Sequence, residues 1–117
     1  MERRESDGTV LVLDGATLGR GDDELGSQLM VNFLRTIAFR DEVPGTVVCY
    51  NGGVKLAEQG NPAVPVLEAL VQKGAEVLLC GTCVSYFQLQ ERLALGRVSN
   101  MQEIVDLLMK AKRMVYA

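Results

Sequence analysis

The sequence predicts an α/β fold, with a mainly parallel sheet and helices on both of its faces. Short runs of strand-forming residues alternate with stretches whose apolar residues recur every three or four positions, the order expected of β-α-β units. The runs at residues 9–14, 46–50 and 75–79 are mostly apolar without alternation, as in strands covered on both faces. We expect a flexible leader at residues 1–8 and a single domain at residues 9–117, because the first eight residues are polar and lack an apolar pattern.

The first half of the domain is predicted to hold a strand, a glycine-rich loop and a long helix. The loop at residues 15–21 contains three glycines and Arg20. Asp22 or Asp23 is expected to cap the helix, since either carboxylate can accept a hydrogen bond from the first turn. The stripe predicted to be buried on this helix consists of Leu25, Leu29, Phe33 and Ile37, with Met30 and Leu34 beside them.

The second strand, at residues 46–50, is followed by Asn-Gly-Gly at residues 51–53 and a long loop that reaches Gly60. Asn61 and Pro62 are typical of an N-cap and a first helical position, so a second helix is predicted from there. Its predicted buried face consists of Val66, Leu67, Leu70 and Val71.

The third strand leads into Cys-Gly-Thr-Cys at residues 80–83, after which a helix is predicted to end near Gly96. That helix is expected to run through Phe87, Leu89 and Leu93. A minor strand at residues 97–99, a helix capped by Asn100 and a final strand at residues 113–116 complete the pattern. The face predicted for the last helix consists of Met101, Ile104, Val105 and Leu108.

The functional site is predicted at the carboxyl ends of the strands. In open parallel sheets, ligands bind beyond these ends, at the point where the strand order reverses. The segments that follow the strands there are residues 15–21, residues 51–60, residues 80–83 and the region around Asn100.

Composition excludes several classes of function. The net charge is −3, from 12 basic and 15 acidic side chains, and no long basic run is present, which argues against a nucleic acid partner. The chain has no histidine, so Cys-His and Ser-His-Asp catalysis and zinc sites that need imidazole are excluded within one chain. No apolar run is long enough for a membrane. Three cysteines are too few for a disulfide scaffold, and we expect a reducing cytoplasm.

The thiols of Cys80 and Cys83 place two nucleophilic side chains within one short segment of the chain. Such a pair can shuttle between dithiol and disulfide, carry sulfur or selenium as a persulfide, or supply half of a metal site completed by another chain. At a junction between a strand and a helix, unpaired backbone N–H groups and the helix dipole favour a thiolate. Alternatively, the two thiols fill core space. The strand end and Gly81 favour exposure of Cys80, whereas Cys49 lies within a strand and is predicted to be a core residue.

Two basic residues near this edge are further candidates. Arg20 can approach an anionic group, and Lys55 favours a thiolate if its loop folds over the third strand. The alternatives are a solvated turn for Arg20 and a surface ion pair for Lys55.

The sequence resembles the DsrE/DsrF-like family, and most closely the C-terminal DsrE-like domain of YedF-type selenium metabolism proteins. The residues that carry the resemblance are Leu18-Gly19-Arg20-Gly21-Asp22-Asp23-Glu24-Leu25-Gly26, Leu29-Met30, Asn32-Phe33, Asn51-Gly52-Gly53-Val54-Lys55-Leu56, Cys80-Gly81-Thr82-Cys83, Asn100-Met101 and Glu103-Ile104-Val105. The resemblance implies a three-layer flavodoxin-like fold, a homo-oligomer (dimer, trimer or hexamer) and a persulfide carried on Cys80. YedF-type proteins usually carry a preceding TusA-like sulfur-carrier domain, which this chain lacks. Sulfur-relay relatives often have Arg-Gly where Phe87-Gln88 stands here.

We therefore expect a sulfurtransferase-like carrier of sulfur or selenium, with Cys80 holding the atom and Cys83 resolving it. The alternatives are a thiol–disulfide redox module and a non-catalytic oligomeric binding or scaffold module. No cofactor and no metal are expected, and a TusA-like sulfur-carrier protein is the expected partner beside further copies of the chain. The residues expected to bind substrate are Arg20, Asn51, Gly52, Gly53, Lys55, Gly81, Thr82 and Asn100.

Overall fold

The computed structural model describes residues 8–117, and the predicted leader lies outside the described residues except for Gly8. The strands are β1 (Thr9–Leu13), β2 (Thr46–Cys49), β3 (Glu76–Cys80), β4 (Arg97–Ser99) and β5 (Arg113–Tyr116). The helices are α1 (Asp23–Ala38), α2 (Val64–Gln72), α3 (Gly81–Tyr86) and α4 (Met101–Lys110), with the 3₁₀ helix η1 (Asn51–Ala57).

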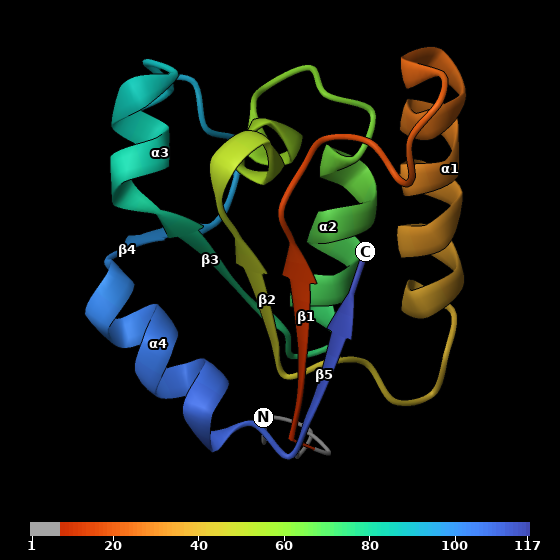
Figure 1. Ribbon diagram of the computed structural model, residues 1–117. Coiled ribbons are helices and arrows are strands. Elements are labelled where there is room, and N and C mark those ends of the chain that lie inside the picture. The colour runs from red at the N-terminus through yellow and green to blue at the C-terminus, as the bar shows by residue number, and fades with distance from the viewer. Residues whose placement is uncertain (1–7) are drawn as a thin grey trace.

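These strands form one sheet in the order β4-β3-β2-β1-β5, with every neighbouring pair parallel. The predicted α/β fold with helices on both faces is confirmed (Figure 1). β1 and β2 lie inside the sheet and are almost wholly buried, which is why their sequences are apolar without alternation.

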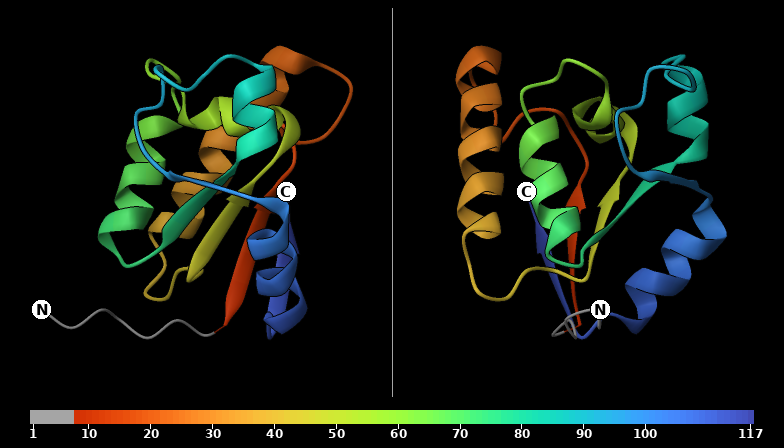
Figure 2. Two further views of the ribbon diagram at one scale, coloured as in Figure 1. Left: turned by 90° about the vertical axis from the view of Figure 1, so that its left-hand side faces the viewer. Right: turned by 180° about the vertical axis from the view of Figure 1, so that it is seen from behind.

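Two cores lie on opposite sides of the sheet. On one side, α1 and α2 pack with η1 and α3 against residues such as Leu11, Val47 and Leu79. On the other side, the residues of the sheet that pack against Ile104 of α4 are Val10, Val12, Val48 and Cys80. Figure 2 shows α4 alone among the described helices on its side of the sheet, opposite α1 and α2. Cys80 therefore faces α4.

The face that α1 buries differs from the predicted one by one position. Asp22 is the N-cap and accepts a hydrogen bond from the backbone N–H of Leu25, as expected. The buried residues are Gly26, Met30, Leu34 and Ala38, whereas Leu25 is 53% exposed. The reason lies at Gly26, where a Cβ atom would stand 2.7 Å from Cβ of Thr17. The loop before α1 touches the helix backbone there and turns that face toward the sheet.

The segment between β2 and α2 is more ordered than the predicted loop. Its first seven residues form η1, with Val54 and Leu56 buried in the core. α2 begins at Val64 rather than at Pro62, and Asn61 accepts a hydrogen bond from the N–H of Ala63 in the turn before the helix.

The helix after the two cysteines is shorter than predicted, because the backbone of Gln88 adopts a left-handed conformation (φ 57°) that ends it. Residues that were expected to be helical therefore lie in an irregular segment, among them Leu93, which forms a single bridge with Glu58. In α4, only Ile104 is fully buried, and Met101 and Val105 of the predicted face are exposed.

Candidate functional site

Cys80 ends β3 and lies against α4. Its side chain belongs to the same core cluster as Val48 and Ile104, and the residue is only 3% exposed. The expectation that Cys80 is exposed is wrong, because α4 covers the sheet at the place where β3 ends.

Cys83 lies in the first turn of α3 and is partly buried. Its Sγ accepts a hydrogen bond from the backbone N–H of Asn51, with a nitrogen–sulfur distance of 2.9 Å. Partial burial and the Cys80 thiol raise the pKa of Cys83, while the N–H of Asn51 acts in the opposite direction. Cys83 packs against the core cluster that contains Cys80, at the junction predicted for the pair, and both thiols are free.

Two glycines allow the chain segments of the site to approach so closely. A Cβ at Gly53 would stand 2.0 Å from the carbonyl oxygen of Leu13, so only glycine lets η1 rest on the end of β1. A Cβ at Gly81 would stand 2.8 Å from the carbonyl oxygen of Ser99. The contact at Gly53 holds η1, and with it the N–H of Asn51, beside Cys83.

A polar network that the sequence analysis missed lies next to Cys80. Ser99, the β4 partner of Cys80, is buried and donates a short hydrogen bond from its hydroxyl to Glu103. Arg97 binds Glu103 through both terminal nitrogens, at 2.8 and 3.1 Å, and binds Glu76 through Nε at 3.0 Å. Together these bonds connect the start of α4 to β4 and β3. They thereby stabilise the position of the helix that covers Cys80.

This network predicts an acid-sensitive loss of stability. Hydrogen bonds from Arg97 and Ser99 lower the pKa of Glu103 from 4.5 to about 2, so the unfolded chain binds the proton more readily than the folded one. The stabilisation is present above pH 4.5 and is lost as the pH falls toward 2. In Glu103→Gln, melting temperature measured between pH 6 and pH 2.5 should therefore fall less steeply than in the wild type. Glu91→Gln, which changes an exposed carboxylate, serves as the control and should retain the wild-type slope.

Tyr50 is a second residue that the sequence analysis missed. Cys49 pairs with Leu79, so continuing the register places Tyr50 level with Cys80 on the face of α4. Burial raises the pKa of the Tyr50 phenol, with smaller effects of Tyr116 and Asp14 in the same direction, so the phenol stays protonated at neutral pH. The sequence could have indicated this position, because aligning the apolar runs that end at Tyr50 and Cys80 as parallel strands places the two residues level with each other.

The other predicted site residues differ in how close they come to the thiols. Lys55 lies with Nζ 4.4 Å from the centre of the Phe87 ring, a cation–π contact rather than a contact with a thiol. Asn100 caps α4 by accepting a hydrogen bond from the N–H of Glu103. Thr82 is exposed in α3, and Arg20 is exposed in the loop before α1, with no hydrogen bond to either thiol within residues 8–117.

Cys49 is a core residue, as predicted. It is fully buried in β2, and this burial raises the pKa of its thiol to about 12. Burial and the raised pKa of its thiol therefore make Cys49 a poor nucleophile in the native protein.

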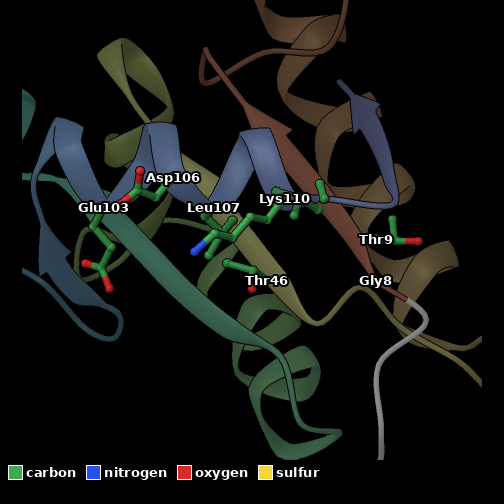
Figure 3. Close-up of a pocket in the computed structure, with 9 residues that line it drawn as sticks. Gly8, Thr9, Thr46, Glu103, Asp106, Leu107 and Lys110 are labelled. Carbon is green, nitrogen blue, oxygen red and sulfur yellow. The ribbon is translucent and has the colours of Figure 1, made fainter.

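Three hollows on the surface of residues 8–117 have linings that include neither Cys80 nor Cys83. One groove of about 390 Å³ runs beneath α4 toward the amino ends of β1 and β2, where Thr9, Thr46 and Lys110 line it (Figure 3). Within residues 8–117, no group of three His, Cys, Asp or Glu side chains is placed to hold a metal ion. None of the helices described is both long enough and apolar enough to span a bilayer.

Known proteins match this chain in family and fold. The ychN protein of E. coli has 15% sequence identity, with a TM-score of 0.63 over 93% of this chain and 98% of the other. The protein of unknown function MTH1491 of Methanobacterium thermoautotrophicum has 19% identity, with a TM-score of 0.67 over 93% and 97%. The comparison with curated proteins found no match. The model of the DsrE/DsrF-like family matches residues 21–116. The chain therefore belongs to the DsrE/DsrF-like family.

Proposed function

We propose that this protein handles sulfur or selenium, accepting a chalcogen atom on its Cys-Gly-Thr-Cys pair as a persulfide or selenosulfide. The observation that carries the proposal is the pair of free thiols at the carboxyl edge of the sheet, with Cys83 packed against the cluster of Cys80 and hydrogen-bonded to a backbone N–H. A backbone donor stabilises a thiolate, and the thiolate is the nucleophile that takes up sulfane sulfur. The resemblance gives Cys80 the carrier role and Cys83 the resolving role.

Intact mass measured before and after incubation with a small persulfide donor tests this function. The wild type should gain one sulfur atom or, once the second thiol has reacted, release sulfide and form an intramolecular disulfide. A variant with both Cys80→Ser and Cys83→Ser retains Cys49 and should do neither, because the remaining thiol is buried and has a pKa of about 12. Equal sulfur uptake by this double variant would refute the proposal.

A thiol–disulfide redox module is the second candidate, and the placement of two free thiols in and against one core cluster favours it. Such a module would form a reversible disulfide with a definite potential and would not accept sulfur from the donor. A loss of two hydrogen atoms under mild oxidant, without uptake or release of sulfur in the donor experiment, would favour this candidate. A non-catalytic scaffold would instead retain assembly and partner binding after replacement of both cysteines.

The finer assignment to YedF-type selenium metabolism rests on the sequence blocks that resemble those proteins. In the same proposal, a cytoplasmic TusA-like sulfur-carrier protein supplies or receives the atom. The residues proposed to contact the chalcogen donor are Arg20, Asn51, Gly52, Gly53, Lys55, Gly81, Thr82 and Asn100.

We also propose that the protein forms a homo-oligomer through the outer face of α4. Met101, Val105 and Met109 lie four residues apart on this helix and are exposed, Met109 to 81%. Val98 of the edge strand β4, directly before the helix, is 51% exposed. A continuous apolar stripe of this kind is typical of an interface between proteins.

Light scattering coupled to gel filtration tests this interface. The wild type should elute as an oligomer, and the double variant Val105→Glu/Met109→Glu should elute as a monomer, because burying two carboxylates is costly. Gln102→Glu adds a charge to an exposed polar position of the same helix and should leave the mass unchanged. A wild type that is monomeric at every concentration tested would contradict the proposal.

A further inference from the structure

We propose that Cys83, and not Cys80, takes up the chalcogen first, and that Cys80 is the thiol that displaces it. This order rests on the proposed function and reverses the roles that the sequence resemblance assigns. It follows from which sulfur is open to a donor and which sulfur has a hydrogen-bond donor to hold a negative charge.

Access separates the two thiols. Cys80 lies in the core cluster beneath α4 with Val48 and Ile104, and only 3% of the residue is exposed. Cys83 is partly exposed at the surface of α3, beside the exposed Thr82. A donor of the form R–S–SH must align its sulfur–sulfur bond with the attacking sulfur, and Cys83 permits this approach without movement of α4.

The backbone around Cys83 also favours its thiolate. The N–H of Asn51 points at Cys83 Sγ across 2.9 Å, and a hydrogen bond to a charged acceptor is stronger than one to a neutral thiol. The backbone of Asn51 is left-handed, with φ of 50°, as the chain turns from β2 into η1 beside Cys83. Partial burial keeps the pKa of Cys83 raised, so the thiolate is scarce at neutral pH but strongly nucleophilic once formed.

The position of Cys80 suits the second step. Cys83 packs against the core cluster that contains Cys80, and Ile104 of α4 in the same cluster shields Cys80 from solvent. Cys80 is therefore placed to react with an atom already bound to Cys83, and it is poorly placed to meet a donor from solution.

Uptake and release each conserve atoms and electrons. The Cys83 thiolate attacks the terminal sulfur of R–S–SH, a new bond forms from Sγ to that sulfur, and the electron pair of the broken bond leaves on RS⁻. The Cys80 sulfur then attacks Sγ of Cys83, and the proton of its thiol passes to the departing sulfur. The terminal sulfur leaves with the electron pair of the broken bond as H₂S, so it is reduced while Cys80 and Cys83 are oxidised to a disulfide. A thiol reductant restores the pair, and selenium follows the same steps.

Single variants, treated with a small aliphatic persulfide and followed by intact mass and sulfide release, test the order. Cys80→Ser should gain one sulfur atom and hold it, with sulfide release at least tenfold below that of the wild type. Cys83→Ser should gain at least tenfold less sulfur than Cys80→Ser. Uptake by Cys83→Ser, or by neither single variant, overturns the order, whereas a wild type that neither gains sulfur nor releases sulfide refutes the proposed function instead.

Native alkylation of the wild type provides a test that does not depend on the folding of a variant. With limiting iodoacetamide and peptide mapping, Cys83 should be labelled at least tenfold faster than Cys80. Equal rates, or faster labelling of Cys80, contradict the proposed order. Cys80→Ala, which keeps an apolar group beneath α4, should behave in the sulfur uptake assay as Cys80→Ser does.

Discussion

Replacing Gly53 by alanine is expected to unfold the protein or to lower its free energy of unfolding by about 3 kcal/mol or more. The added Cβ would lie 2.0 Å from the carbonyl oxygen of Leu13 and 2.8 Å from its carbonyl carbon, so either β1 or η1 would have to move. Urea unfolding followed by circular dichroism measures this change.

Gly52→Ala is the matched control for this prediction. A Cβ at Gly52 would make ordinary contacts at 3.7 Å with Gly15 and Ala16. This variant should lose less than about 1 kcal/mol, as is usual for a substitution without a steric conflict. Equal stability of the two variants would show that the close approach of η1 to β1 is unnecessary for folding.

Replacing Ile104 by alanine is expected to cost about 2–5 kcal/mol, the range for removing a large aliphatic side chain from a core. Ile104 is fully buried and is the α4 residue that joins the core cluster of Val48 and Cys80. The same substitution should loosen α4 from the sheet and thereby raise the alkylation rate of Cys80. Urea unfolding and peptide-mapped labelling report the two effects.

Gln102→Ala provides the comparison on the same helix. Gln102 is exposed, so its truncation should change stability by less than about 1 kcal/mol and leave Cys80 protected. If Ile104→Ala left Cys80 as slow to react as the wild type does, α4 would not be the cover of this thiol.

The order of strands and helices was predictable because continuous apolar runs and helical periodicity are local signals. The predicted strand ends differ from the observed ones by at most one residue. Asp22 and Asn100 cap α1 and α4 as predicted, whereas Asn61 lies two residues before Ala63, the N-cap of α2. The buried face of α1 was not predictable in this way. Gly26 carries no apolar side chain, and its contact with Thr17 is a matter of tertiary packing rather than of hydrophobic pattern.

The position of the thiols was predictable, but the difference between them was not. The sequence places Cys80 and Cys83 at the junction of β3 and α3, where the structure has them. Whether Cys80 is exposed depends on α4, which begins 21 residues later at Met101 and returns across the sheet. The hydrogen bond from Asn51 to Cys83 joins residues 32 positions apart, so local sequence patterns cannot predict it.

Cys49, the third cysteine, can serve as a native reporter of unfolding. Cys49 lies in an interior strand of the sheet, so a labelling reagent can reach it only when the central sheet comes apart. Slow modification of Cys49 under native conditions would measure the free energy of global opening, much as the slowest amide hydrogens do. No probe has to be engineered for that measurement, and peptide mapping separates its readout from those of Cys80 and Cys83 in the same mass spectrum.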